Sequence, residues 1–393
     1  MTARRPQRIA IALPRDNDFY RALAAQMCRG FEACGLEATS VLRLLAADDM
    51  RDFCASVRPD VLLEMNRSRA MAEFVPDDVV HLTWVVDLGG RAVDDFAGSA
   101  YTYLFSDAWL PHFTLDAPHR WLGPGACPQD YPQRAHTSNQ RLAFLGHIPN
   151  PWTPEELARD VTGGAGVCDF GSLLPAIERL LRPDDPHQAL LGVEDFLRRI
   201  DGACYAIGGH PLVIDDALAY DITCRVVRHL NRTELADAAL AMASRRGLQG
   251  DALARWLGIW GTPNWSRWPR FAPHYHGWLA TPAQMSEVYT GTEIVLHEGT
   301  GVHFRSMDAM STGALVSFRE GDLGSHVDAI HLGFEPHVHF VPFHLHEIDD
   351  ALAPYLADPV RAQAMRDAAA ARIRDAHTWR HRAQGILDDL ASL

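Results

Sequence analysis

An arginine and an aspartate behind a glycine loop are the residues of this sequence best suited to bind a charged substrate. Arg305 and Asp308 are three apart in a helical pattern, so both side chains can lie on one helix face. The loop Gly299-Thr300-Gly301 precedes them and follows the apolar run Ile294 to Leu296. Backbone N–H groups at a helix start attract phosphate, a guanidinium binds the same group, and a carboxylate binds hydroxyls. The stretch predicts a site for the diphosphate and ribose of a sugar nucleotide.

The same residues also allow a purely structural interpretation. Glycines before a helix are often turn residues only, and an arginine and an aspartate at this spacing can form an ion pair within the helix. The pattern nevertheless continues past Gly313 into a second apolar run, Ala314 to Val316. Strand, loop, helix and strand in this order belong to a parallel sheet, in which ligands bind beyond the carboxyl ends of the strands.

Apolar runs alternate with helical patterns through both halves of the chain, which predicts an α/β protein. A stretch rich in proline and polar residues separates the halves before a new run, Arg141 to Gly146, begins. The predicted division is an N-terminal domain over residues 1–138, a C-terminal domain over 139–375 with a helical insertion at about 153–247, and a final helix over 376–393.

Carboxylates behind the predicted strands of the N-terminal half are candidates for a general base. Asp87 is the preferred one because the glycines at 89 and 90 let a substrate approach it closely, although an aspartate here can also cap a helix. Asp107, Asp16 and Asp18 follow other predicted strands and are weaker candidates.

Composition limits the classes of function. The 393 residues are 47% hydrophobic and 22% charged, as expected for a globular protein of two domains. A formal net charge of −14 argues against a nucleic-acid partner. No apolar stretch is long enough for a membrane span, no export signal is recognisable, and the seven cysteines form no C-x-x-C pair, so we expect a cytoplasmic protein with reduced thiols.

The sequence supports neither a dinucleotide cofactor nor a bound metal. The N-terminal half has no G-x-G-x-x-G fingerprint for NAD or FAD. Histidines gather near the end of the chain, but no cysteine or acidic residue repeats in step with them apart from Glu347, as a metal site would require. These histidines are His331, His337, His339, His344 and His346.

The chain also resembles a known family. The run His303-Phe304-Arg305, followed by Asp308-Ala309 and by Gly313 to Val316, resembles the donor-site signature of GT-B glycosyltransferases of the spore-maturation-protein type. The family usually has Phe-Glu where this chain has Met307-Asp308, so the carboxylate is kept on a side chain one methylene shorter. Further segments follow the family in order: Pro59 to Asn66, Leu82 to Asp87, Tyr103 to Asp107, Trp121 to Gly125 and His377 to Leu387.

The resemblance implies the GT-B fold, with two Rossmann-like domains and a last helix that crosses back to the first. It implies a metal-independent glycosyltransferase that needs no cofactor and uses a UDP-, dTDP- or GDP-sugar as donor, with a protein, a glycan or a small molecule as acceptor. The turn from Tyr275 to Leu279 resembles the one that contacts the nucleotide base. The implied donor-binding residues are Gly261, Trp278, Leu279, Gly299, Thr300, Gly301, Val302, His303, Arg305 and Asp308.

Two other functions share this architecture. A sugar-nucleotide epimerase or hydrolase of GT-B fold would release or convert the sugar without an acceptor. A non-catalytic relative would act as the partner of a true transferase, and the aspartate at 308 is the feature that keeps this alternative open.

Overall fold

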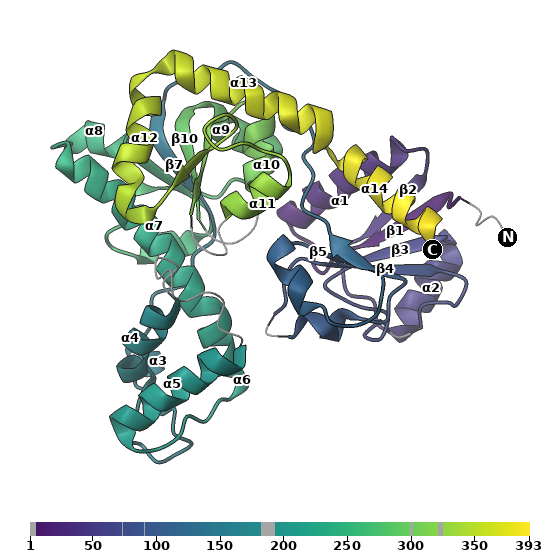
Figure 1. Ribbon diagram of the computed structural model, residues 1–393, viewed down its shortest axis with the longest axis horizontal. Coiled ribbons are helices and arrows are strands. Elements are labelled where there is room, and N and C mark those ends of the chain that lie inside the picture. Colours follow the sequence, from purple (N-terminus) through teal and green to yellow (C-terminus); the bar gives the residue numbers. More distant parts are fainter. Residues whose placement is uncertain (1–4, 73, 90, 182–192, 299–301, 321–324) are drawn as a thin grey trace.

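Two six-stranded parallel sheets make up the framework of the protein. The computed structural model describes residues 5–72, 74–89, 91–181, 193–298, 302–320 and 325–393. Figure 1 shows the N-terminal sheet in purple and blue beside the C-terminal sheet, whose helices are green and yellow. Each sheet carries helices on both faces, which confirms the predicted α/β class with two Rossmann-like sheets.

The N-terminal sheet has the strand order β2-β1-β3-β4-β5-β6. Alternation along β1 separates its two faces: Ile9 packs toward α1 (Asp18–Glu32), and Ala10 packs toward α2 (Ala47–Val57). Successive side chains of a strand point to opposite faces, so alternate residues of this one strand contact the helices of both layers. The strands are β1 Arg8–Ala12, β2 Glu37–Val41, β3 Val61–Met65, β4 Val80–Val85, β5 Tyr101–Leu104 and β6 His119–Trp121.

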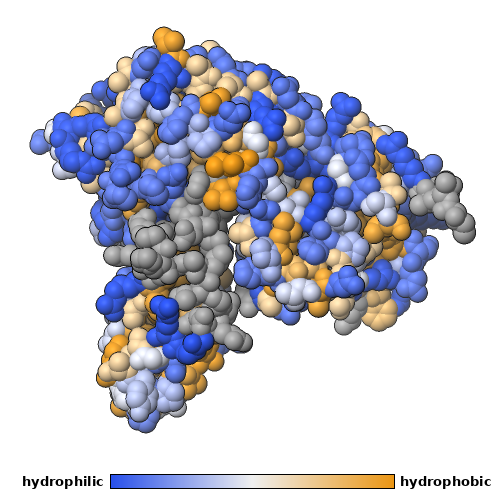
Figure 2. Space-filling view, viewed as in Figure 1, coloured by the Kyte–Doolittle hydropathy of each residue, from blue (hydrophilic) through white to orange (hydrophobic). Residues whose placement is uncertain are grey.

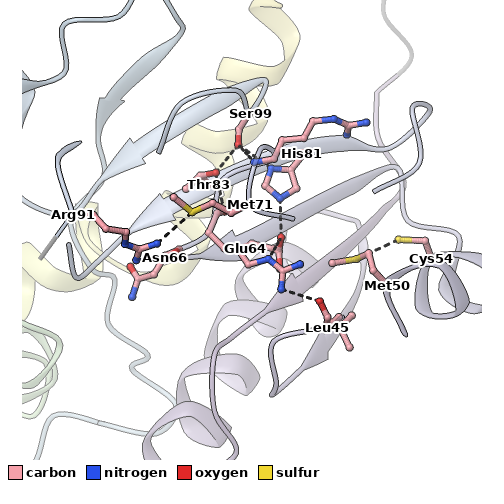
Figure 3. Close-up of polar contacts among 12 residues, drawn as sticks. Leu45, Met50, Cys54, Glu64, Asn66, Met71, His81, Thr83, Arg91 and Ser99 are labelled. Atoms are coloured by element: carbon pink, nitrogen blue, oxygen red, sulfur yellow. Dashed lines mark hydrogen bonds and ion pairs between the residues drawn. The ribbon is translucent and has the colours of Figure 1, made fainter. Parts of the chain in front are cut away.

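A buried polar network ties the central strands of this sheet together (Figure 3). His81 on β4 lies between Glu64 on β3 and Ser99, with its ring nitrogens 2.9 Å from the carboxylate of Glu64 and 2.9 Å from the hydroxyl of Ser99. Thr83 hydrogen-bonds to the same hydroxyl at 2.6 Å. Buried polar groups need such partners, so the network links β3, β4 and the segment that leads into β5.

The C-terminal sheet has the order β12-β11-β10-β7-β8-β9. Renumbered from its own first strand and read from the opposite edge, this is the Rossmann order 3-2-1-4-5-6, which reverses between β7 and β10. Helices α7 (Val226–Arg245) and α12 (Ile348–Ala357) cover one face, and α10 (Phe304–Ser311) and α13 (Pro359–Ala376) cover the other. The strands are β7 Gln140–Leu145, β8 Leu257–Trp260, β9 Tyr275–Gly277, β10 Thr292–His297, β11 Val316–Arg319 and β12 Val341–Phe343.

A helical lobe interrupts the C-terminal sheet between β7 and β8. It has its own apolar core, to which Phe170, Ile177 and Ile200 contribute. The lobe projects away from both sheets, and Figure 2 shows open space between its lower part and the N-terminal domain. Its helices are α3 Pro154–Leu157, α4 Phe170–Leu181, α5 Val193–Gly208 and α6 Asp216–Tyr220, after which a π-helical turn, Asp221–Arg225, leads into α7.

The last helix, α14 (Trp379–Ser392), returns to the N-terminal sheet and packs on α1. Its first residue, Trp379, donates its backbone N–H to the carbonyl of Ala126 at 3.0 Å and its ring N–H to Gln26 at 3.2 Å. A Cβ added at Gly30 would lie 2.7 Å from the carbonyl oxygen of Trp379, so the close contact of the two helices requires this glycine.

The shorter helical elements of the described residues include α8 Gly250–Ala254, α9 Pro282–Thr290, α11 Ser325–His331 and the 3-10 turns Asp107–His112 and Pro263–Arg267. None of the seven cysteines is in a disulfide. Within the described ranges, no helix has the length and apolar character needed to cross a bilayer.

Candidate donor and acceptor site

Both sheets reverse their strand order beside the same cavity. In the N-terminal sheet the reversal lies between β1 and β3, and α1, which follows β1, contributes Asp18, Phe19 and Ala22 to the cavity wall. In the C-terminal sheet the reversal lies between β7 and β10, and Gly146 and Arg305 line the cavity there. The cavity measures about 210 Å³. Parallel sheets bind ligands at such reversals, so a ligand here would contact both domains.

Two glycines bring the ends of β7 and β8 together. Gly261 has φ +149°, and a Cβ on it would lie only 1.9 Å from the carbonyl oxygen of Gly146. Trp265 donates its ring N–H to the same oxygen at 2.8 Å. No other residue fits at 261, because any side chain would collide with the neighbouring backbone. The contact places His147 beside Thr262, with the imidazole Nδ1 2.9 Å from the hydroxyl.

The start of α10 positions Arg305 at the cavity. The guanidinium donates to the carbonyl oxygen of Leu145 at 2.5 Å, so it lies across the end of β7. His303 caps the helix and accepts the Arg305 backbone N–H at 3.5 Å. Phe304 points the other way, into the aromatic core of the N-terminal sheet, 5.7 Å from Trp84 between ring centroids. Consecutive residues thus anchor α10 in one domain and direct a cation into the cleft.

Two further arginines come from α7. Arg232 pairs with Glu298 at the end of β10 at 2.7 Å, and Arg228 lies 3.6 Å from Asp87 of the N-terminal domain. Burial lowers the pKa of Arg232, but the negative charge of Glu298 acts in the opposite direction. These two arginines were not singled out in the sequence analysis. Arginines four apart share one helix face, and this spacing could have indicated a cationic surface on the helix.

The histidines of the site are neutral. Burial, assisted by the positive charges of Arg232 and Arg305, lowers the pKa of His147 and of His297 to about 4 each. The same causes hold the pKa of His303 well below its usual value. Because these imidazoles carry no charge at neutral pH, the arginines set the positive field of the site. An anionic ligand fits that field.

Asp308 lies at the polar end of the cavity. Its carboxyl is buried, and burial together with the negative charge of Asp130 raises its pKa well above the usual range. The hydroxyl of Tyr131 interacts with this carboxyl and acts in the opposite direction. Tyr131 belongs to the connection between the two sheets and also lines the cavity. No pattern in the sequence pointed to it, because a lone tyrosine in a connecting segment has no periodicity to mark it.

The structure gathers half of the predicted donor-binding residues. Gly261, Trp278, Leu279, Arg305 and Asp308 all line the cavity, although they are spread over 48 positions of the chain.

Of the other five, the structure describes Val302 and His303, and neither of these two lines the cavity. Gly299, Thr300 and Gly301 lie outside the described residues. Val302 is buried in the C-terminal core near Asp328 and is not among the residues that line the cavity. His303 caps α10 and does not line the cavity either.

The four candidate bases have different surroundings. Asp18 lines the cavity. Asp87 lies at the end of β4, where the side-chain oxygen of Asn66 accepts the backbone N–H groups of Val86 and Asp87 at 2.6 and 2.9 Å.

The remaining two are engaged elsewhere. Asp107 pairs with His331 of α11 at 2.5 Å, and Asp16 pairs with Arg21 at 2.6 Å. In the part of the chain that the structure describes, no three histidine, cysteine or acidic side chains are grouped as a metal site would need.

Comparisons with known proteins give a family match for the C-terminal part of the chain. Residues 225–388 match the family model described as glycosyl transferase-like, and this range includes α7, the Trp278 turn and α10. No protein with a curated description matches the chain.

Several solved structures are similar in fold. Anabaena HepE in complex with UDP-glucose is 12% identical, with a TM-score of 0.48 over 98% of this chain and 100% of that one. WaaG, a glycosyltransferase involved in lipopolysaccharide biosynthesis, is 8% identical, with a TM-score of 0.48 over 97% and 99%. AviGT4, a glycosyltransferase involved in avilamycin A biosynthesis, is 10% identical, with a TM-score of 0.46 over 98% of each chain.

Proposed function

We propose that this chain is a glycosyltransferase with the GT-B fold, and that it transfers a sugar from a nucleoside diphosphate donor to an acceptor bound by the N-terminal domain, without a metal. The observation that carries the proposal is the single cavity at which both sheets reverse their strand order. Its C-terminal wall is cationic and polar, with Arg305 and Asp308, whereas its N-terminal wall carries the carboxylate of Asp18.

The donor lies along the C-terminal wall in this proposal. The turn with Trp278 and Leu279 contacts the base, Asp308 contacts the ribose, and Arg305 binds the diphosphate. Trp278 supports the first contact because its side chain is 51% exposed beside the cavity, and an exposed indole offers a stacking surface to a base. A UDP donor is the first to test, because HepE was solved with UDP-glucose.

Transfer requires stabilisation of the diphosphate as it leaves. Arg305, with Arg232 behind it, supplies positive charge where negative charge develops, and a fixed charge in a partly buried site needs no reorganisation during the reaction. The acceptor hydroxyl loses its proton to a carboxylate of the N-terminal wall in an inverting reaction. Asp87 is our first choice for this base, and Asp18 is its rival because it lies on the cavity.

We further propose that the domains divide near residues 138 and 139, with the lobe at about 153–247 as an insertion and 376–393 as the returning helix. The core clusters support this division, because the residues of β1 to β6 and of β7 to β12 pack in separate clusters. The final helix belongs to the N-terminal cluster through Trp379 and Ile386.

Thermal unfolding with a panel of UDP, dTDP, GDP, CDP and their sugars tests the proposal. A ligand that binds only the folded state raises Tm according to its affinity. We expect the nucleotides of one nucleobase to raise Tm selectively, and we expect Arg305→Ala to remove this increase. Incubation with the selected sugar nucleotide and no acceptor then separates the enzyme classes, because an epimerase or a hydrolase forms product without one. No shift with any member of the panel would favour a non-catalytic partner instead.

A further inference from the structure

The connection between the sheets contributes a side chain to the donor half of the cavity. Tyr131 lies between β6 and β7, is 3% exposed, and lines the cavity together with Asp308. Its hydroxyl is 3.5 Å from the sulfur of Met285 on α9 and interacts with the carboxyl of Asp308. A phenol and a carboxyl therefore stand together at the polar end of an otherwise largely apolar cavity.

Contacts to both domains hold Tyr131 in place. Its carbonyl oxygen accepts the hydroxyl of Ser311 on α10 at 2.8 Å. The preceding Asp130 accepts the side-chain amide of Gln26 at 3.1 Å and pairs with Arg29, and both partners lie on α1. A side chain fixed from both sides is preorganised, so it loses little freedom when it binds a ligand.

A second hydroxyl behind this pair is unsatisfied. Tyr289 on α9 is fully buried, and its hydroxyl has no hydrogen-bond partner among the described residues. Its ring centroid lies 6.4 Å from that of Tyr131, and the charge of Asp308 acts on its hydroxyl. Buried polar atoms are usually paired, so this hydroxyl adds a polar group behind Tyr131 and Asp308 in an otherwise apolar region.

The short side chain of Asp308 gives a reason for a second polar group beside it. The donor signature that this chain resembles has glutamate at the position of Asp308, and the shorter side chain ends about 1.5 Å earlier, the length of one C–C bond. Tyr131 places an additional oxygen beside it. Tyrosine can donate or accept a hydrogen bond, and a carboxyl group offers two oxygens, so the pair suits two neighbouring hydroxyls.

We infer that Tyr131 is a donor-binding residue whose hydroxyl, together with the carboxylate of Asp308, binds the two ribose hydroxyls of a ribonucleoside diphosphate sugar. The inference rests on the proposed function and deepens it in two ways. It assigns part of the donor site to the interdomain connection, and it excludes 2′-deoxy donors such as dTDP-sugars. A deoxyribose would leave this polar pair without a partner, and sites built around a hydroxyl discriminate strongly against ligands that lack it.

Calorimetric titration with UDP and 2′-deoxy-UDP, and with GDP and 2′-deoxy-GDP, tests the inference. We expect the wild-type protein to bind the ribonucleotide of one pair at least about tenfold more tightly than its deoxy form. Tyr131→Phe should reduce this ratio to about threefold or less while Tm changes little. Tyr101→Phe is the matched control, because Tyr101 stacks on Tyr103 in the N-terminal sheet and its hydroxyl is remote from the cavity.

A double substitution separates binding from structure. Asp308→Glu alone should weaken ribonucleotide binding, because the longer side chain needs the space of the Tyr131 hydroxyl. Tyr131→Phe combined with Asp308→Glu should restore much of it, since one methylene is gained where one oxygen is lost and the volume is nearly conserved. A merely structural tyrosine predicts additive losses instead.

The outcomes are distinct. A Tyr131→Phe protein that keeps the wild-type ratio of ribo to deoxy affinity overturns the inference and leaves the proposed function standing. A wild-type protein that favours the deoxy form also overturns it. A wild-type protein that binds none of the four nucleotides, nor any member of the thermal panel, overturns the proposed function itself.

Discussion

The strand ends of the two sheets face each other with opposite character. On the C-terminal side the charged groups are mostly buried and paired, as in the ion pair of Arg232 and Glu298, whose side chains are 16% and 11% exposed. On the N-terminal side the carboxylates are open to solvent, with side-chain exposures of 60% for Asp16 and 56% for Asp87. The same fold therefore presents a preorganised cationic surface and an open acidic one.

The difference indicates a division of labour. A diphosphate is doubly charged and has the same shape in every donor, so a rigid site can be built for it in advance at the cost of burying arginines. An acceptor hydroxyl needs only a base within reach and a path for entry.

Removing the base should have the largest effect. Asp87→Asn is expected to lower turnover on the order of 10²- to 10⁴-fold while the donor Kd stays unchanged, because the residue lies on the acceptor side. Activity and donor titration are to be measured in parallel with Asp18→Asn. If Asp18→Asn abolishes turnover and Asp87→Asn does not, the general base is Asp18. Normal turnover in both variants would show that neither of these carboxylates is the general base.

Removing the arginine that binds the diphosphate should have the second-largest effect. Arg305→Ala is expected to weaken donor binding on the order of 10²-fold, since losing one partner of a buried charge contact costs about 2–5 kcal/mol. Arg305→Lys keeps the charge without the planar guanidinium, so its donor affinity should lie between those of the wild type and of Arg305→Ala. Arg270→Ala serves as the control, because this arginine is half exposed and pairs with Asp237 on the outer surface. Wild-type affinity in Arg305→Ala would contradict the donor assignment.

Proton uptake should accompany donor binding. His147 and His297 have a pKa of about 4 in the free protein, and a diphosphate nearby favours their charged forms, so their pKa rises on binding. A group whose pKa is higher in the complex takes up protons, and affinity then increases as pH falls from about 6.5 toward 4.

UDP-glucose is the suitable probe for this effect because its diphosphate does not titrate in that range. We expect several-fold tighter binding at pH 5.5 than at pH 7.5, with proton uptake visible in calorimetry when buffers of different ionisation enthalpy are compared. The effect should shrink in His147→Gln. Affinity that is independent of pH, or that decreases as the pH is lowered, would show that neither imidazole senses the diphosphate.

The smallest effects are expected at the remaining carboxylates of the open side. Asp16→Asn removes an exposed contact with Arg21 and should leave Tm nearly unchanged and turnover within about twofold of wild type, as exposed pairs contribute little. Asp107→Asn breaks the pair with His331 across the domains and should change the Michaelis constant more than turnover. A loss of turnover as large as that of Asp87→Asn would place Asp107 at the chemistry instead.

The sequence alone determined the two sheets, because strand and helix periods are local and survive without knowledge of the fold. It also indicated Arg305, Asp308 and the Trp278 turn, since each lies in a short motif. The resemblance to GT-B enzymes joined these motifs into a function, and the match of residues 225–388 to a glycosyl transferase-like family supports the glycosyl-transfer part of that prediction.

Only the tertiary structure decided which residues share the cavity. Arg305 donates to Leu145, 160 positions earlier, and Tyr131 meets Asp308 across a domain connection. Asp18 reaches the cavity because α1 follows the strand at which the N-terminal sheet reverses. Such contacts depend on strand order and on the packing of one sheet against the other, and neither leaves a local pattern in a single sequence. Periodicity determines the elements, and their non-local packing determines the site.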